Sequence, residues 1–228
     1  METNTAKRNT KPVVVIVGFG KGLGRAIASR FEKVGYVSVG ISRTSPMISA
    51  DTTIPAEVNK AFAKIEEQFG TPDTVICNTA MLTMGPFLST PSGVFEQTWR
   101  TAVMSTFNVA SAVLPRMVRA KHGTLIVTGA TASIKGGKNF SAFSSAKFAL
   151  RGLTQSLARE FQPQGVHVAH VLIDGIVWSE KSRERFPELQ EENAISPSGA
   201  ANLYFTLATQ PKSAWSHELD LRPYSENF

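Results

Sequence analysis

Short apolar runs alternate along this chain with longer stretches in which apolar residues recur at helical spacing. Runs rich in Val and Ile that end at glycine or polar residues are typical of buried strands, and the periodic stretches are typical of helices packed on one face. Expected strands cover 13–17, 36–41, 74–77, 124–128, 166–173 and 215–221, and expected helices cover 23–34, 55–69, 91–120, 141–161 and 198–209. This alternation predicts an α/β fold with a parallel sheet.

The stretch from Val13 to Gly24, VVVIVGFGKGLG, joins the first expected strand to the first expected helix through a glycine-rich turn. Gly18 allows a tight turn. Gly22 and Gly24 let a diphosphate and the sheet approach the backbone, where free amides and the positive helix end face the ligand. Leu23 stands where the commoner Gly-x-Gly-x-x-Gly spacing has its last glycine. The order of strand, turn and helix predicts a dinucleotide site, with an ordinary flexible loop as the alternative.

The second expected strand ends at Ser42 and Arg43 rather than at an acidic residue. An Asp or Glu there would accept from the ribose 2′-hydroxyl of NAD(H) and would repel a 2′-phosphate. Arg43, with Lys21 from the glycine turn, can pair with a 2′-phosphate instead. NADP(H) is therefore favoured over NAD(H), and two solvated surface cations are the alternative.

The pattern also makes three local predictions. Only seven residues separate Arg43 from Asp51, which leaves room for a very short third strand or a shortened crossover. Val34 continues the apolar stripe of the first helix and should be buried. Pro115 should kink the long helix over 91–120 or end it early.

Composition favours one domain over 12–228, because 228 residues that are 42% hydrophobic suffice for a full core. Residues 1–11 should form a loose polar tail. This tail lacks the apolar segment that a secretory signal contains. The longest apolar run of the chain is far shorter than a membrane span, so a cytoplasmic protein with no membrane contact is expected. Cys77 lies alone in an apolar run and should be packed rather than reactive.

The net charge of +6 raises nucleic acid as a partner. Basic residues alternate with acidic ones in the expected helices, as in RFEKVG, so no nucleic acid is expected. The four histidines have no metal-ligand spacing, and no metal is expected; His167 and His170 should be hydrogen-bonded structural groups. The charged residues 176–197 have the length of a mobile lid over a substrate.

From Pro12 to its end the chain resembles the short-chain dehydrogenase/reductase family. The matches are the VGFGKGLG turn, Asp51 after the third strand, CNTA at the end of the next, Lys147 with the AL that follows, and DGIVWS. The resemblance implies a single-domain Rossmann fold, with a doubly wound, mostly parallel sheet of about seven strands and helices on both faces. It also implies a bound NADP(H), a small-molecule substrate, and a homodimer or homotetramer paired through the two long helices.

One residue of the family's catalytic set is retained. The catalytic lysine corresponds to Lys147, but the tyrosine position four residues earlier is Phe143, the serine position is Ala130, and the asparagine position is about Ala102. A phenyl ring has no proton to give, and general acid or base catalysis is worth roughly a hundred- to ten-thousandfold in rate. Lys147 is therefore more safely a cofactor ligand than a catalyst, and Thr131, next to Ala130, is the first candidate for a substitute.

Ser133, Ser144 or a water held by Lys147 are further candidates for the proton route. The resemblance thus implies an oxidoreductase that acts on a small or medium carbonyl or alcohol by a nonstandard proton route, or a catalytically silent dinucleotide-binding sensor or scaffold. The substrate pocket should be apolar, lined by Met81, Met84, Phe140, Phe143 and Trp178. The cofactor positions that the turn, the strand ends and the resemblance give are Gly18, Lys21, Gly22, Leu23, Gly24, Ser42, Arg43, Asp51, Thr52, Asn78, Thr79, Ala80, Lys147, Gly175, Ile176 and Ser179.

Overall fold

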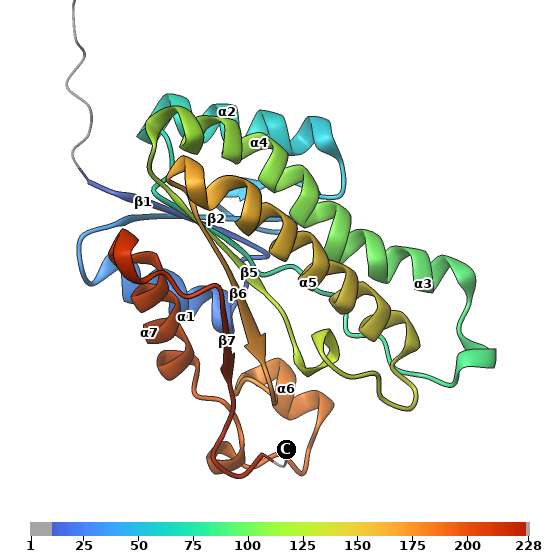
Figure 1. The fold of residues 1–228 in the computed structure, drawn as a ribbon. Coiled ribbons are helices and arrows are strands. Elements are labelled where there is room, and N and C mark those ends of the chain that lie inside the picture. Colours follow the sequence, from blue (N-terminus) through green and yellow to red (C-terminus); the bar gives the residue numbers. More distant parts are fainter. Residues whose placement is uncertain (1–10, 227–228) are drawn as a thin grey trace, which may run out of the picture.

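A computed structural model describes residues 11–226 of the chain, which form one parallel seven-stranded sheet with helices on both faces (Figure 1). The expected tail over 1–11 lies outside the described residues except for Lys11. The strands are ordered β3-β2-β1-β4-β5-β6-β7. They are β1 (Val13–Val17), β2 (Val37–Ser42), β3 (Ile48–Ser49), β4 (Thr74–Cys77), β5 (Thr124–Thr128), β6 (His167–Ile173) and β7 (Glu218–Leu221).

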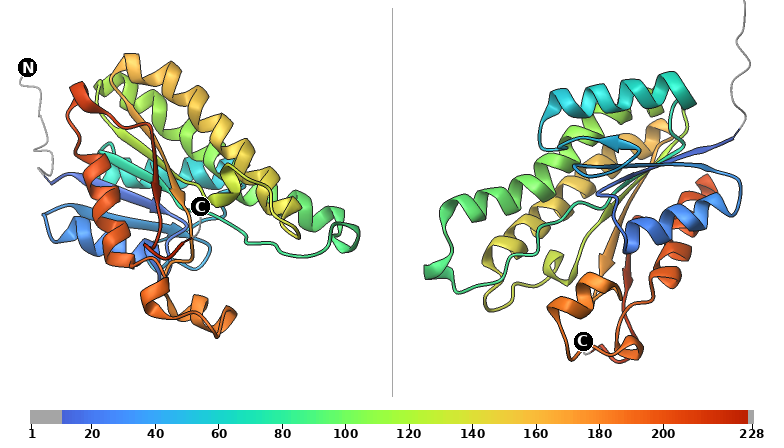
Figure 2. Two further views of the ribbon diagram at one scale, coloured as in Figure 1. Left: turned by 60° about the horizontal axis from the view of Figure 1, so that its bottom comes forward. Right: turned by 180° about the vertical axis from the view of Figure 1, so that it is seen from behind.

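Two helical layers enclose the sheet (Figures 1 and 2). The helices are α1 (Leu23–Glu32), α2 (Pro55–Phe69), α3 (Ser92–Trp99), α4 (Ser105–Ala120), α5 (Ser141–Phe161), α6 (Glu180–Arg185) and α7 (Pro197–Ala208). α1 and α7 pack together over one face, while α2, α4 and α5 cover the other. Single turns of 3₁₀-helix occur at Phe87–Ser89, Thr131–Ser133, Gln162–Gln164, Glu191–Asn193 and Lys212–Ala214.

The core follows the strand pattern. β1, β4, β5 and β6 are buried along their whole length because both faces are covered by helices. Alternate residues of each strand point to the two helical layers, so Val15 packs with α2 and α4 while Val14 packs with α1 and α7. Cys77 at the end of β4 is buried as predicted, and burial raises the pKa of its thiol to about 12.

The third strand is short, as the spacing predicted, with two residues paired to the end of β2. The prediction for Val34 is wrong, and so is one of the two outcomes expected at Pro115, an early end of the helix. Val34 is exposed because α1 ends at Glu32 and the chain then turns toward Gly35, whose φ is 93°. Pro115 does not end its helix, which continues to Ala120.

Pro115 is tolerated because it and Ser111, whose carbonyl loses a helical partner, both face solvent. The irregularity in this long helical segment lies earlier, where a π-helical turn at Arg100–Met104 joins α3 to α4. Within residues 11–226, the helices lack the length and apolarity needed to cross a membrane.

Candidate functional site

The glycine turn lies at the carboxyl end of β1, in the middle of the sheet. Gly18 has a φ of 83°, and a Cβ atom there would lie 2.6 Å from the backbone oxygen of Asn78. Only glycine suits this position, because it tolerates the left-handed backbone and leaves room for β4. The first turn of α1 carries no acidic residue. Its N-cap is Gly22, and among the described residues no side chain caps this end of the helix by a hydrogen bond. The turn therefore presents an open, electropositive helix end.

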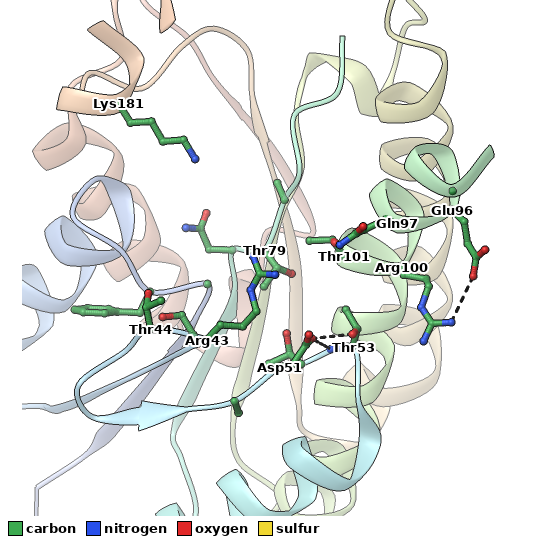
Figure 3. Close-up of a pocket in the computed structure, with 18 residues that line it drawn as sticks. Arg43, Thr44, Asp51, Thr53, Thr79, Glu96, Gln97, Arg100, Thr101 and Lys181 are labelled. Atoms are coloured by element: carbon green, nitrogen blue, oxygen red, sulfur yellow. Dashed lines mark hydrogen bonds and ion pairs between the residues drawn. The ribbon is translucent and has the colours of Figure 1, made fainter. Parts of the chain in front are cut away.

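A cavity of about 660 Å³ opens beside this turn and extends across the carboxyl ends of β2 and β4 to α3 (Figure 3). This volume is in the range of small-molecule sites. Half of the predicted cofactor positions line it: Gly18, Ser42, Arg43, Asp51, Thr52, Asn78, Thr79 and Ala80. From α3 and the π-helical turn come Glu96, Gln97, Arg100 and Thr101, which the sequence reasoning did not single out.

Hydrogen bonds hold the Asp51 loop in place. Thr53 donates to the Asp51 carboxylate from both its backbone amide and its hydroxyl, at 2.9 and 2.7 Å. Burial alone would raise the pKa of Asp51, but these bonds and the nearby charges of Arg43 and Arg100 outweigh it, so the pKa is lowered. Below the loop, Asn108 of α4 donates to the backbone oxygen of Thr52 at 3.1 Å.

A second cavity of about 580 Å³ lies on the other side of the β2 end. Lys21 and Arg25 supply two cations to it, and Ser42, Thr44 and Ser45 supply hydroxyls. The Ser42 hydroxyl oxygen is buried and has no hydrogen-bond partner among the described residues. Two cations with three hydroxyls fit a phosphate group. Sequence reasoning missed Arg25, although it directly follows the last glycine of the turn.

The predicted lid begins over the glycine turn. Gly175, just before the lid, has a φ of 136°. Ser179 lies against the glycine turn, since its Cβ is 3.4 Å from the position that a Cβ on Gly22 would occupy. Ser179 caps α6 by accepting from the Ser182 amide at 3.1 Å. The following residue of the lid, Glu180, lies 3.9 Å from Lys21, and Lys181 lines the larger cavity (Figure 3).

Lys147 is deeply buried on α5, with 2% of its surface exposed. Its ammonium nitrogen donates to the backbone oxygen of Thr128 at 2.8 Å and lies 5.7 Å from the centre of the Phe143 ring. Burial lowers the pKa of Lys147 to about 8. A buried, largely uncompensated lysine at the carboxyl end of β5 is costly to the fold, which favours a functional role over that of an exposed helix residue.

The remaining proton-route candidates differ in their surroundings. The Thr131 hydroxyl donates to Asp174 at the end of β6, and that carboxylate also lies 3.4 Å from Arg222. The Ser133 hydroxyl accepts from the backbone amide of Ala130 at 3.2 Å, as in an ordinary turn. The Ser144 hydroxyl is buried and has no partner among the described residues.

The structure separates the predicted positions into two groups. Gly18, Lys21 and the predicted residues at the strand ends line the two cavities, whereas Lys147 and Thr131 lie beyond them near the ends of β5 and β6. The other predicted cofactor positions line neither cavity: Gly22, Leu23, Gly24, Gly175, Ile176 and Ser179. Of the residues expected to form an apolar substrate pocket, Met84 is among the exposed large hydrophobic side chains. The sequence reasoning did not single out Asp174. In the stretch DGIVWS it used only the match of Gly175, the residue after Asp174, to the family motif.

Sequence reasoning also missed a polar cluster near Lys147, in which His170 is buried and Arg151 and Glu218 are partly exposed. Glu218 of β7 accepts two hydrogen bonds from Arg151 of α5, at 2.7 and 2.8 Å, and a ring nitrogen of His170 lies 3.0 Å away. Arg151, with a smaller contribution from His170, lowers the pKa of Glu218 to about 2, and burial lowers that of His170 to about 4. As predicted, His170 and His167 are hydrogen-bonded; the ring of His167 stacks on Trp215.

Comparison with known proteins identifies the family. The family model described as short chain dehydrogenase matches residues 12–189. A short-chain dehydrogenase/reductase of Armillaria gallica is 31% identical over 176 residues, which cover 68% of this chain and 67% of the relative. The structure of a short-chain dehydrogenase from Rhodopseudomonas palustris, 30% identical, superposes with a TM-score of 0.79 over 93% of this chain and 99% of that one.

A Tyr-to-Phe variant of ElxO, described with NADPH bound, shares the fold with a TM-score of 0.83 at 23% identity, over 92% of this chain and 97% of its own. Other neighbours in fold are described with NADP or, in one case, with 5-hydroxy-NADP. The glycine turn, the sheet order and these matches agree, and the chain belongs to the short-chain dehydrogenase/reductase family of oxidoreductases.

Proposed function

We propose that this protein binds NADP(H) and transfers hydride between its nicotinamide ring and a small or medium carbonyl or alcohol. The observation that carries the proposal is the uncapped start of α1 beside two cavities that share Ser42, with Arg43 lining one of them and Lys21 and Arg25 lining the other. A helix end without an acidic residue favours the diphosphate, and the cations favour the additional phosphate of NADP(H). Neighbours of this fold solved with NADP or NADPH support the choice of cofactor.

The residues present fit this cofactor. Gly18 lets the turn close against the backbone of Asn78, which leaves the uncapped start of α1 beside the larger cavity, and the unpartnered Ser42 hydroxyl suits a phosphate oxygen near Arg43. Lys147 would bind the ribose hydroxyls of the nicotinamide half, and residues 176–197 would act as the lid. The nicotinamide ring supplies or accepts the hydride, while the chain's own residues orient it and handle the proton.

Substitution of Arg43 tests the preference for the phosphorylated cofactor. Arg43→Ala should weaken NADPH binding about tenfold or more while leaving NADH binding nearly unchanged, because one charge-assisted phosphate contact is lost. Calorimetric titration of both cofactors measures this. Arg119→Ala, at an exposed position near the end of α4, is the matched control. Equal losses for NADPH and NADH, or no loss for either, would contradict the assignment of the phosphate site.

A catalytically silent NADP(H)-binding protein is the second candidate. It is favoured by Phe143, which places an inert ring 5.7 Å from the Lys147 ammonium where the family has its proton donor. A Tyr-to-Phe variant of ElxO, a neighbour in fold, is described with NADPH bound. Tight binding of NADPH without turnover of any alcohol or carbonyl would favour this candidate; NADPH-dependent turnover would exclude it.

We also propose that the chain forms a homodimer or homotetramer through its two long helices. Phe107 on α4 and Phe148 on α5 are 49% and 45% exposed, and an interface would cover such rings. Analytical ultracentrifugation tests this proposal. Phe148→Glu should shift the protein toward the monomer, whereas the same change at Leu88, exposed in another part of the chain, should not.

A further inference from the structure

Asp174 is a buried carboxylate at the carboxyl end of the sheet. It follows β6 directly, its backbone amide donates to the oxygen of Leu221 at 2.8 Å, and only 7% of its surface is exposed. Burying a carboxylate is costly unless charged or hydrogen-bonding groups compensate it. Arg222, with a guanidinium nitrogen 3.4 Å from one carboxylate oxygen, and the hydroxyl of Thr131 supply that compensation.

The hydrogen bond from Thr131 to Asp174 determines whether the Thr131 hydroxyl acts as a donor or as an acceptor toward a substrate. A threonine hydroxyl has one proton and two acceptor lone pairs. Because Thr131 gives its proton to Asp174, its oxygen is left as an acceptor toward other groups. A substrate alcohol can donate to such an oxygen, while a substrate carbonyl cannot.

Thr131 and Asp174 lie at the edge of the sheet where ligands of this type of fold bind. The turn at Thr131–Ser133 follows the end of β5, packs against α5, and contacts β6, whose end carries Asp174. Lys147 of α5 bonds to the last residue of β5, three positions before Thr131. Ligands in open parallel sheets bind outside the carboxyl ends of the strands, so these groups flank the expected position of the reacting carbon.

We propose that Asp174, acting through the Thr131 hydroxyl, accepts the proton released when this protein oxidises an alcohol. This inference rests on the function proposed above. In the step, the carbinol C–H bond breaks and its hydride passes to the nicotinamide ring of NADP⁺, which is reduced. The alcohol O–H proton passes to the Thr131 oxygen as the Thr131 proton passes to Asp174, and a C=O bond forms. Reduction of a carbonyl follows the reverse path and begins with Asp174 protonated.

In this scheme Thr131 touches the substrate and is the catalytic residue, while Asp174 is a positioning residue and proton acceptor behind it. The other titratable pair near Lys147, His170 with Glu218, does not compete for this role. His170 faces Gly129 so closely that a Cβ there would lie 2.3 Å from its Nε2, and its surface is closed off from solvent. His170 and Glu218 therefore serve the packing of α5 on β6 and β7.

Three substitutions test the inference in the full-length protein, with secondary alcohols and NADP⁺ as substrates. Thr131→Val keeps the shape but removes the hydroxyl, and Asp174→Asn keeps a hydrogen-bond acceptor but takes up no proton. Each should lower kcat by about a hundredfold or more, the scale of a lost general base. Thr131→Ser restores the hydroxyl and should retain most of the activity. The affinity for NADP⁺, measured by calorimetry, should change less than about twofold in all three variants, since neither Thr131 nor Asp174 lines the two cavities.

Asp220→Asn is the matched control, because Asp220 contacts the same Arg222 guanidinium as Asp174 does but, among residues 11–226, accepts no hydrogen bond from a hydroxyl. It should leave kcat unchanged. The double variant Thr131→Val with Asp174→Asn should be no slower than either single variant, because the two residues act as one unit. A purely structural role would instead give additive losses of thermal stability and kcat together.

The outcomes separate the inference from the proposed function. If Asp174→Asn turns over as fast as the wild type, the inference is overturned and the proposed function stands. If the wild type binds NADP⁺ but oxidises no alcohol and reduces no carbonyl, the inference is overturned and the silent-binder alternative holds. If neither NADP⁺ nor NADPH binds, the proposed function itself fails.

Discussion

Lys147 should make the free energy of unfolding depend on pH in a way that its replacement by methionine abolishes. Burial lowers the pKa of this ammonium from 10.5 to about 8. The unfolded chain therefore holds a proton that the folded chain releases between these two values. At roughly 1.4 kcal/mol for each pH unit, the charged form costs the folded state about 3 kcal/mol below pH 8.

The sign of the effect follows from the lowered pKa. The penalty is complete below pH 8 and fades as the pH rises toward 10.5, so wild-type stability gains about 3 kcal/mol relative to Lys147→Met across that interval. The hydrogen bond to Thr128 is lost in the variant at every pH. It therefore shifts the variant's curve by a constant and leaves the difference in slope intact.

Urea unfolding of both proteins at several pH values between about 7 and 10.5 measures the difference. Lys212→Met is the control, because Lys212 also donates to a backbone oxygen, that of Lys121 at 2.9 Å, but is exposed. Its stability curve should run parallel to that of the wild type. Parallel curves for Lys147→Met as well would refute the reasoning, since a lysine that titrates alike in both states is not desolvated by the fold.

Three further outcomes follow from the geometry. Gly18→Ala should destabilise the fold by about 2 kcal/mol or more and abolish NADPH binding, because its Cβ would lie 2.6 Å from a backbone oxygen. The control Gly20→Ala places its Cβ where nothing lies within 4 Å and should have neither effect. Thermal unfolding measures the stability of both variants, and calorimetry measures their binding of NADPH. Glu218→Gln should flatten the loss of stability on acidification from about pH 4.5 to 2, because Arg151 holds the pKa of Glu218 at about 2; urea titrations check it. Cys77 should resist thiol reagents in the folded protein and react after unfolding, because burial raises its pKa to about 12.

Local pattern was sufficient for the main elements and for the glycine turn beside the two cavities. The predicted bounds of β4, β5 and α5 match the structure residue for residue, because each is an apolar run or helical stripe delimited by turn residues. The glycine turn was also visible, since the backbone conformation that Gly18 adopts is one that only glycine supplies readily. Where periodicity continued past a helix end, as at Val34, the same reasoning failed.

Contacts between distant segments were decided only by the tertiary structure. Thr131 and Asp174 are 43 residues apart, and Arg151 and Glu218 are 67 apart. They meet because β5, β6 and β7 are neighbours in the sheet and α5 packs over them, an order that periodicity along the chain does not encode. The sequence alone thus determined the α/β fold and the glycine turn, and the order of the strands determined that the buried carboxylate of Asp174 lies against the Thr131 hydroxyl.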